Sequence, residues 1–368
     1  MKFTCEKNSF AREVSFAQEI IASKNALSIM SNVLLEAAEG VLSIKATDIK
    51  VSFETILPVD TAEPGTITVF CDKLSGILST IPEGDICIEQ DDTKVVVKPT
   101  FKKVRFQLKT ISSEKFPELP DVPEEYYFSV PAGEFKEMIS QTFFAVSDDE
   151  TRYFMNGVFI EKSEEGLVLV ATDGRRLSYS KKVFDDAKIP DFKGIIVPPK
   201  VLGLVLKHAP DEGLIAIAVT EKSIFFRFGS YKISSVLIEG QFPNYRKVIP
   251  ESQKNKILLK RTDLLDALKR VAIFVEQKSR RTFFGISEGM IVLSSEESDL
   301  GTAREEIPCV FSGPEATIAL NYRYIEDPLK VMDCENISIE FTEANRAITV
   351  SPEPSKDYFH VIMPMQIE

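Results

Sequence analysis

The chain has 368 residues and a mass of 41.3 kDa, which is enough for two or three domains. Hydrophobic residues make up 44% of it and charged residues 27%, a composition that excludes a largely disordered protein. The formal net charge of −12 excludes a surface that is basic throughout but allows a local basic patch. No apolar run approaches the roughly 18 residues of a membrane span, and the start MKFTCEKNSF lacks the apolar core of a secretory signal.

Three stretches with helical periodicity open three similar segments of the chain. Their apolar positions run from Phe10 to Ile21, from Phe135 to Val146 and from Leu264 to Val275, at spacings of three and four residues. We expect Ser147 and Asp148 to end the second of these helices. Each segment is therefore predicted to begin with an amphipathic helix.

A Glu-Gly turn followed by a β-rich stretch comes after each helix. The three stretches read EGVLSIKATDIKVSFET, EGLVLVATDGRRLSYSK and, less closely, EGMIVLSSEESDLGTAREEI. The Ala-Thr-Asp of the first two places Thr47 against Thr172, 125 residues later. Such a spacing is far longer than a solenoid repeat and indicates repeated domains.

A second helix and a Pro-rich linker complete the pattern. Further apolar helical stretches open at Cys71, Pro198 and Asn321, and Phe116-Pro117 recurs as Phe242-Pro243, 126 residues later. We therefore predict an α+β fold of three copies of one domain, each with two helices packed on antiparallel sheets. The predicted domains are 1–122, 123–250 and 251–368.

Cysteines and histidines give little sign of chemistry. The five cysteines are odd in number and form no Cys-x-x-Cys pair, so we expect reduced thiols in the cytosol and neither a disulfide framework nor a zinc site. The two histidines, His208 and His360, have no nucleophile motif nearby and are expected on the surface or in packing. We expect no metal and no cofactor.

Basic residues recur on the predicted helices of all three copies. Two readings stay open: ordinary solvated helix faces, or a basic lining that attracts phosphates without sequence preference if the helices of all copies face one way. The basic positions are Arg12, Lys24, Lys73, Lys136, Lys200, Lys207, Lys260, Arg261, Lys269, Arg270, Arg323 and Lys330.

The chain closely resembles the bacterial β sliding clamp family, the processivity subunits of the replicative DNA polymerase (DNA polymerase III). The resemblance spans the whole chain: it starts at MKFTCEKNSF, is best in TRYFMNGVFIE, LVATDGRRL and FPNYRKVIP, and ends in HVIMPMQI. It implies a non-catalytic protein of the bacterial cytoplasm, at replication forks. Two subunits of three similar domains would close head-to-tail into a ring around double-stranded DNA, with helices lining the hole.

The resemblance also implies a cleft between the middle and last domains that binds a short linear peptide motif. The motif occurs in the replicative polymerase, the clamp loader, repair polymerases and mismatch-repair proteins. Methionines and aliphatic side chains suit such a cleft because they repack around several ligands. The matching positions are Met155, Thr172, Gly174, Arg175, Arg176, Leu177, Pro243, Lys247, Val248, Val361, Ile362, Met363, Pro364 and Met365.

Two further sets of residues follow from the resemblance. The positions that match the family's DNA contacts are Lys24, Lys73, Arg152, Tyr153 and Lys200. Those that match its dimer interface are Phe106 and Leu108 on an edge strand of the first domain, and Ile273 and Phe274 near the first helix of the third. An alternative for these four is that they belong to the core of their own domains.

The sequence departs from better-known family members at a few positions of the peptide cleft. Arg175 stands where His is common, Lys247 and Gln366 stand where Arg is common, and Glu368 extends the tail. Lys247 lacks the fork of donors that arginine offers. We expect these changes to alter peptide preference.

Two other functions remain as alternatives. A metal-dependent enzyme could use Thr172-Asp173-Gly174 as a nucleophile or phosphate turn and Asp148-Asp149-Glu150 as a metal site. No Walker loop, HExxH or Gly-x-Ser-x-Gly accompanies them, and a hairpin turn explains Asp173-Gly174. A peptide-binding scaffold without a DNA role would make the basic helices incidental.

Overall fold

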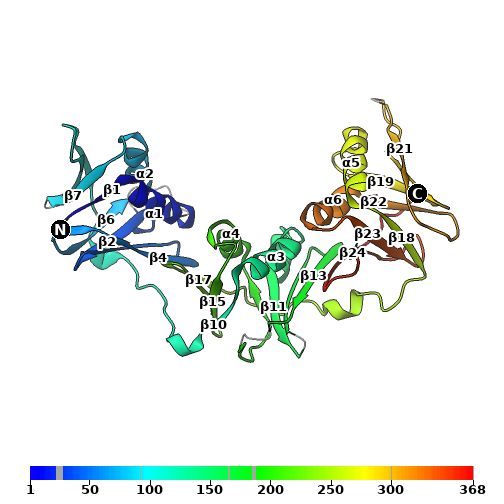
Figure 1. Cartoon of the computed structure of the whole chain (residues 1–368), viewed down its shortest axis with the longest axis horizontal. Coiled ribbons are helices and arrows are strands. Elements are labelled where there is room, and N and C mark those ends of the chain that lie inside the picture. The colour runs from blue at the N-terminus through cyan, green and yellow to red at the C-terminus, as the bar shows by residue number, and fades with distance from the viewer. Residues whose placement is uncertain (22–27, 92, 165, 185–187, 300, 368) are drawn as a thin grey trace. The chain divides into compact units, whose positions relative to one another are not determined.

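The structure is a computed structural model that describes residues 1–21, 28–91, 93–164, 166–184, 188–299 and 301–367. The predicted repeat is present in the order of its elements (Figure 1). Each copy has one strand, a helix, a group of strands, a second helix and three more strands. This order confirms the prediction of three α+β domains with antiparallel sheets and two helices each.

The three copies contain the following elements. The first has β1 (Lys2–Glu6), α1 (Lys7–Ile20), β2 (Asn32–Ala38), β3 (Val41–Thr47), β4 (Val51–Pro58), β5 (Asp60–Glu63), β6 (Gly65–Phe70), α2 (Cys71–Thr80), β7 (Asp85–Asp91), β8 (Lys94–Pro99) and β9 (Phe106–Lys109). The second has β10 (Phe128–Pro131), α3 (Ala132–Phe143), β11 (Val158–Ser163), β12 (Gly166–Thr172), β13 (Arg176–Lys182), β14 (Ile195–Val197), α4 (Pro199–His208), β15 (Leu214–Val219), β16 (Ser223–Phe228) and β17 (Tyr231–Val236). The third has β18 (Asn255–Lys260), α5 (Arg261–Val271), β19 (Arg281–Ser287), β20 (Met290–Ser294), β21 (Arg304–Pro308), β22 (Ala316–Asn321), α6 (Tyr322–Val331), β23 (Asn336–Phe341), β24 (Ile348–Glu353) and β25 (Tyr358–Ile362).

The elements belong to two compact units. One comprises Met1–Ala132 with Glu212–Leu237, and the other Gly133–Asp211 with Ile238–Glu368. The strands of the second copy are shared between them: β10 and β15–β17 lie in the first unit, and β11–β14 in the second.

Each unit contains one eight-stranded sheet to which two copies of the repeat contribute. In the first unit its order is β10-β15-β16-β17-β4-β3-β2-β6, with the two copies joined between β17 and β4. In the second unit it is β14-β11-β12-β13-β25-β24-β23-β18, joined between β13 and β25. Both joins therefore follow one rule: the last strand of one copy pairs with the third strand of the preceding copy's first strand group.

Smaller sheets complete both units. The first has β5-β1-β7-β8-β9 and the second has β21-β20-β19-β22. Strands β9 and β21 therefore lie at the edges of their sheets. β9 is the last strand of the first copy, and β21 is the third strand between the two helices of the third copy. Strands at these two positions pair with each other at both internal joins.

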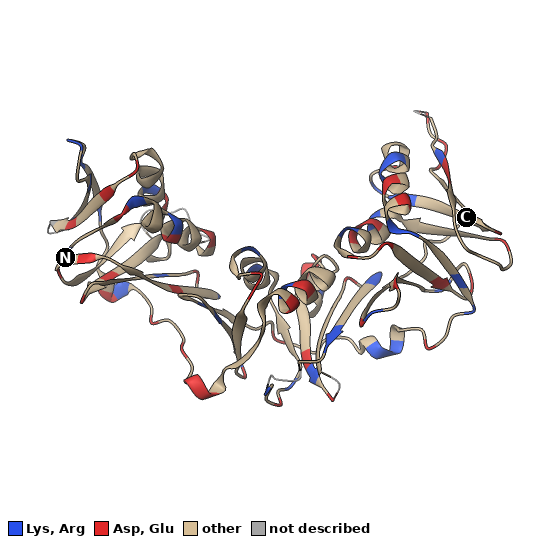
Figure 2. Cartoon of the chain, viewed as in Figure 1, with Lys and Arg blue, Asp and Glu red and all other residues tan. Residues whose placement is uncertain are grey.

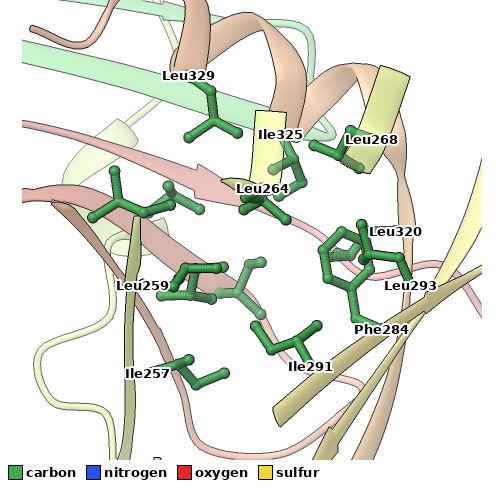
Figure 3. Packing of buried hydrophobic residues seen from close by; sticks show 14 of the residues in the cluster. Ile257, Leu259, Leu264, Leu268, Phe284, Ile291, Leu293, Leu320, Ile325 and Leu329 are labelled. Atoms are coloured by element: carbon green, nitrogen blue, oxygen red, sulfur yellow. The ribbon is translucent and has the colours of Figure 1, made fainter. Parts of the chain in front are cut away.

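Helices cover these sheets with their apolar faces. In the third copy, Leu264 and Leu268 of α5 and Ile325 and Leu329 of α6 pack on strand residues such as Phe284, and all are at most 2% exposed (Figure 3). Burying side chains of this size stabilises the fold by about 1.5–3 kcal/mol each. In the first unit, Phe16 of α1 lies 4.4 Å from Phe53 of β4 and 5.0 Å from Tyr231 of β17, ring centroid to centroid, so the helix covers the join itself.

Candidate peptide and nucleic-acid interfaces

The join between β13 and β25 brings together two parts of the predicted peptide cleft that lie far apart in sequence. Leu177 is directly opposite Val361, and the backbone N–H of Met363 donates to the carbonyl of Arg175 at 2.9 Å. The tail then crosses to the neighbouring sheet, where Met365 donates to the carbonyl of Ala319 at 2.8 Å. Residues 363–365 are thus tied to both sheets of the second unit.

An apolar cluster lies on the Leu177 face of this join. Leu177 and Val361 pack with Phe242 and Tyr245, which come from the segment that follows the second copy. Leu177 and Val361 are each 3% exposed, whereas Met363 is 45% and Val248 is 54% exposed. Met363 and Val248 are thus exposed to solvent, while Leu177 and Val361 are buried.

Sequence reasoning missed aromatic residues on the same face. Tyr179 and Phe359 stack with centroids 4.9 Å apart, one step along the join from Leu177 and Val361. They line a hollow of about 750 Å³ together with Tyr245 and Ile249. The alternation in RLSYSKK and YFHVI is the signal that could have placed them, because residues two apart on a strand share a face.

Burial and a hydrogen bond change the acidity of Tyr245 in this cluster. Its hydroxyl donates to Oε1 of Glu161 at 2.6 Å, and Arg246 forms an ion pair with the same carboxylate. Burial and the bond to Glu161 raise the pKa of Tyr245, so the phenol stays neutral. The adjacent 3-10 turn η5 (Tyr245–Val248) ends in Lys247 and Val248, both exposed, while Pro243 is half-buried.

A tight turn between β12 and β13 holds three more predicted cleft residues. The Thr172 hydroxyl donates to the Arg176 carbonyl at 2.6 Å and accepts from the Gly174 N–H at 3.0 Å. Asp173 Oδ1 accepts the backbone N–H of both Arg175 and Arg176, and Gly174 has φ +85°. These bonds confirm that Asp173-Gly174 is a hairpin turn; Arg175 is exposed beside it.

Arg176 and Ile362 lie opposite each other on the other face of the join. Ile362 is fully buried in the core of the third copy. The Arg176 guanidinium donates to Asp173, to Asp327 of α6 and to the Phe144 carbonyl, and lies 4.6 Å from the Tyr324 ring centroid. The structure thus separates these two predicted residues from the Leu177 face, and their effect on a ligand there would be indirect.

His360 is buried on the same face as Arg176. Its Nδ1 lies 2.9 Å from the Ser178 hydroxyl, and Nε2 has no hydrogen-bond partner among the described residues. Burial lowers the pKa of His360 to about 3, and the nearby Arg176 charge acts in the same direction. The expectation of a packing histidine is therefore correct for His360.

The short turn η4 (Glu150–Met155) carries predicted residues of both interfaces. Met155 ends it and is 4% exposed, while Tyr153 is 53% exposed. Asp149 caps the turn by accepting from Thr151, and Arg152 Nε donates to Asp149 at 2.8 Å. Hydrogen bonds from Thr151 and then Arg152 hold the pKa of Asp149 below its usual range.

The other predicted DNA contacts are spread over the helices. Lys73 is exposed on α2, Lys200 is half-buried in the first turn of α4, and Lys24 lies outside the described residues. Several other basic helix residues form ion pairs, and both basic and acidic residues occur on the helices (Figure 2). The pairs are Arg12–Glu13, Lys136–Asp211, Lys269–Asp266, Arg270–Glu305 and Lys330–Glu326.

The predicted dimer contacts lie on the edge strand β9 and in a turn that follows α5. Phe106 and Leu108 are half-buried on β9, and Phe106 lines a hollow of about 540 Å³ beside α2. Ile273 and Phe274 lie in a 3-10 turn that continues α5, 76% and 38% exposed. Ile273 thus does not belong to its own domain's core.

Little else among the described residues suggests catalysis. No group of three His, Cys, Asp or Glu side chains there could hold a metal ion. Burial raises the pKa of Cys5 and of Cys71 to about 12, which keeps both thiols protonated. No helix in the described part of the chain is long and apolar enough to cross a membrane.

Comparison with known proteins decides the family. Models of the N-terminal, central and C-terminal domains of the DNA polymerase III beta subunit match residues 1–120, 129–244 and 246–366. A beta sliding clamp of Treponema pallidum (strain Nichols) is 45% identical over 372 residues, covering 100% of both chains. The chain belongs to the DNA polymerase III β subunit family. It is a β sliding clamp, a non-catalytic processivity factor of that polymerase, which rules out the enzyme alternative.

Solved β clamps have the same fold. A DNA polymerase sliding clamp from Pseudomonas aeruginosa superposes with a TM-score of 0.92 at 28% identity, and one from Bacillus subtilis with 0.94 at 25%. Both matches cover 100% of each chain. The resemblance drawn from the sequence is thereby confirmed over its full length.

Proposed function

We propose that two copies of this β clamp chain close head-to-tail into a ring around double-stranded DNA. The ring tethers the replicative polymerase and other proteins through a peptide cleft. Each chain contributes domains 1–122, 123–250 and 251–368, so the ring contains six repeats. Its place is the bacterial cytoplasm, at replication forks.

The observation that carries this proposal is the rule followed by the internal sheet joins. β17 pairs with β4, and β25 pairs with β13. In each case the last strand of one copy pairs with the third strand of the group between the two helices of the preceding copy. Applied once more, the rule pairs β9 of one chain with β21 of a second. Because each chain offers one edge of each kind, the contact is heterologous and closes into a ring when the rotation allows. An unpaired edge strand otherwise invites aggregation.

Charge and shape at the two edges fit such a pairing. Lys102, Lys103 and Arg105 precede β9 and Lys109 ends it, all exposed, whereas β21 carries two acids, Glu305 and Glu306, and one base, Arg304; Glu305 also pairs with Arg270. Opposite charges across an interface favour correct register and faster association. The exposed Ile273 and the hollow beside Phe106 supply apolar surface for the same contact.

DNA is held by topology and only loosely by contacts. The contacts proposed are Lys24, Lys73, Arg152, Tyr153 and Lys200, and the many paired charges on the helices leave a weak field. Weak contacts without sequence preference let a ring slide along the duplex.

The peptide cleft consists of the Leu177 face of the β13–β25 join and the tail that crosses it. Met363, Met365 and Val248 offer adaptable apolar contacts over a floor of Leu177 and Val361. The proposed ligands are short motifs of the replicative polymerase, the clamp loader, repair polymerases and mismatch-repair proteins. This cleft alone would also serve a scaffold without a DNA role, but such a scaffold would not be retained on circular DNA.

Light scattering after gel filtration tests ring closure. The wild type should have twice the 41.3 kDa mass of one chain at micromolar concentration. Ile273→Glu and Phe106→Glu should each give a single-chain mass because they place a charge in the apolar contact. Leu214→Glu, at a residue 63% exposed on β15, is the matched control and should stay a dimer. A monomeric wild type, or dimers of both edge variants, would contradict the proposal.

A further inference from the structure

Arg152 links the turn η4 to the β12–β13 turn of the cleft. Its Nη2 donates to the Asp173 carbonyl at 3.2 Å while its Nε is held by Asp149 at 2.8 Å. Its Nη1 lies against Gly174: a Cβ added there would lie 2.7 Å from that nitrogen. One side chain thus crosslinks two segments that the sequence assigns to different interfaces.

The first copy of the repeat has a turn like the one at Gly174. The turn after β3 has the same hydrogen bonds: Thr47 Oγ1 accepts from Ile49 N, and Asp48 Oδ1 accepts from Lys50 N and Val51 N. Ile49 there has φ +78°, close to the +85° of Gly174. A side chain is therefore tolerated at this turn position in the first copy, where Ile49 is 70% exposed. In the second copy, the Arg152 guanidinium occupies the space that a side chain would need.

The same turn η4 also offers the exposed Tyr153, a proposed DNA contact. Tyr153 and Phe154 pack against Gly240, at the beginning of the segment that leads to Pro243. The Arg152 backbone breaks the helical geometry of η4, with φ −117° and ψ +49°. Its side chain is 44% exposed, so a phosphate can reach it. A guanidinium that turns to a phosphate beside Tyr153 can no longer hold both Asp173 and Asp149.

We propose that Arg152 couples the two interfaces, because DNA phosphates and the cleft turn compete for its guanidinium. This inference rests on the proposed function. Without DNA, Arg152 fixes the Asp173–Gly174 turn and thereby the start of β13, which carries Leu177. With DNA, the turn keeps the bonds of Thr172 and Asp173 but loses its contact with Arg152, so its position is less fixed and peptide binding weakens. Linkage requires the reciprocal effect, so bound peptide weakens the DNA contact by the same factor.

Fluorescence anisotropy of a labelled clamp-binding peptide from the replicative polymerase of the same bacterium tests the coupling. The dimer is titrated at low salt with and without an excess of a linear duplex of about 30 base pairs, whose own binding is followed with a second label. For the wild type we expect the duplex to raise the peptide Kd about 5-fold. The effect should vanish at high salt, where the duplex is released.

Arg152→Lys separates charge from crosslinking. Lysine keeps the attraction to phosphate but lacks the fork that joins Asp149 to Asp173. This variant should bind duplex like the wild type, bind peptide about 5-fold more weakly without DNA, and show no further change with DNA. Lys256→Ala, which removes a surface cation paired with Glu353, is the matched control and should behave as the wild type.

The outcomes separate this inference from the function on which it rests. A wild-type peptide Kd that does not respond to bound duplex, or an Arg152→Lys variant that still responds, would overturn the coupling while peptide and DNA binding stand. A wild type that binds no peptide, or no duplex at low salt, would overturn the proposed function and the inference together.

Discussion

Arg176 Nη1 donates to Asp327 Oδ2 at 2.7 Å, which ties the start of β13 in the second copy to α6 in the third. Both side chains are mostly buried, at 11% and 26% exposure. The remaining guanidinium donors bind Asp173 and the Phe144 carbonyl. The pair therefore fixes the β12–β13 turn against the last domain, at the place where the cleft residues of both meet.

Breaking this pair should destabilise the second unit. We expect Arg176→Ala to lower the free energy of unfolding by about 3 kcal/mol, since it leaves Asp173 and Asp327 without their shared partner. Asp327→Ala should lower it by less, because Arg176 keeps its bonds to Asp173 and the Phe144 carbonyl. The double variant should lose less than the sum, with a coupling energy of about 1–3 kcal/mol. Urea unfolding of the four proteins measures this cycle. Additive losses would show that the two side chains act independently.

The C-terminal tail should be required for peptide binding but not for the dimer. Deleting residues 364–368 removes the backbone hydrogen bond from Met365 to Ala319. The double variant Leu177→Ala, Met365→Ala shortens two apolar side chains of the proposed cleft. We expect either change to weaken peptide binding at least tenfold, about 1.4 kcal/mol, in fluorescence anisotropy. Light scattering should still give a dimer. The control is Ile367→Ala, 51% exposed beyond the bonded tail, which should bind normally. Unchanged affinity in the deletion would refute the cleft assignment.

His360 should make the protein less stable as the pH falls below about 6.5, its pKa when unfolded. The folded-state pKa of about 3 lies below that value, so the unfolded chain binds one more proton between pH 6.5 and 3. Stability is therefore fully present above pH 6.5 and falls by up to about 1.4 kcal/mol per pH unit below it.

His360→Asn keeps a polar partner for Ser178 and removes this proton. Urea unfolding of wild type and variant at pH 8, 6.5 and 5.5 shows how the free energy of unfolding of each depends on pH. These pH values lie above the range in which carboxylates usually titrate. We expect the two curves to run parallel above pH 6.5 and to converge below it. Parallel curves down to pH 5.5 would mean that His360 is protonated in the folded protein.

Ile49 offers a stabilising substitution. It is a β-branched residue at φ +78° and is 70% exposed, so its side chain gains little from burial. Relief of backbone strain of 1–3 kcal/mol should exceed the entropy cost of glycine, and we expect Ile49→Gly to stabilise the fold by about 1 kcal/mol. Urea unfolding should show a higher midpoint with unchanged slope. Ile56→Gly, exposed within β4, is the control and should destabilise.

The sequence predicted the repeat because each copy carries its own local signals. The amphipathic helices, the Glu-Gly hairpins and the Thr47 and Thr172 turns depend on neighbours in the chain, and the structure contains those that lie wholly within the described residues. Helix α3 is shorter than the spacing of its apolar residues predicted, since it ends at Phe143 rather than near Ser147. There the Phe144 carbonyl accepts from Arg176 and Thr142 bonds back to Met138.

The candidate site was predictable only in part, because its contacts are non-local. Leu177 and Val361 meet through a strand pairing that joins residues 184 positions apart, and periodicity does not reveal which strands pair. The ion pair of Arg176 with Asp327 and the hydrogen bond of Arg152 to the Asp173 carbonyl depend on the same tertiary arrangement. The resemblance to the clamp family supplied Arg176 as a cleft position and Arg152 as a DNA position. Only the structure shows what their guanidinium groups bind.

The central claim is that this clamp holds DNA by encircling it. Its most direct test is gel filtration of labelled dimer loaded on a nicked circular plasmid by the clamp loader of the same bacterium, before and after one restriction cut. A ring predicts that the protein elutes with the circle at high salt and falls off once the plasmid is linear. Equal retention on circular and linear DNA, or none on the circle, would contradict the account.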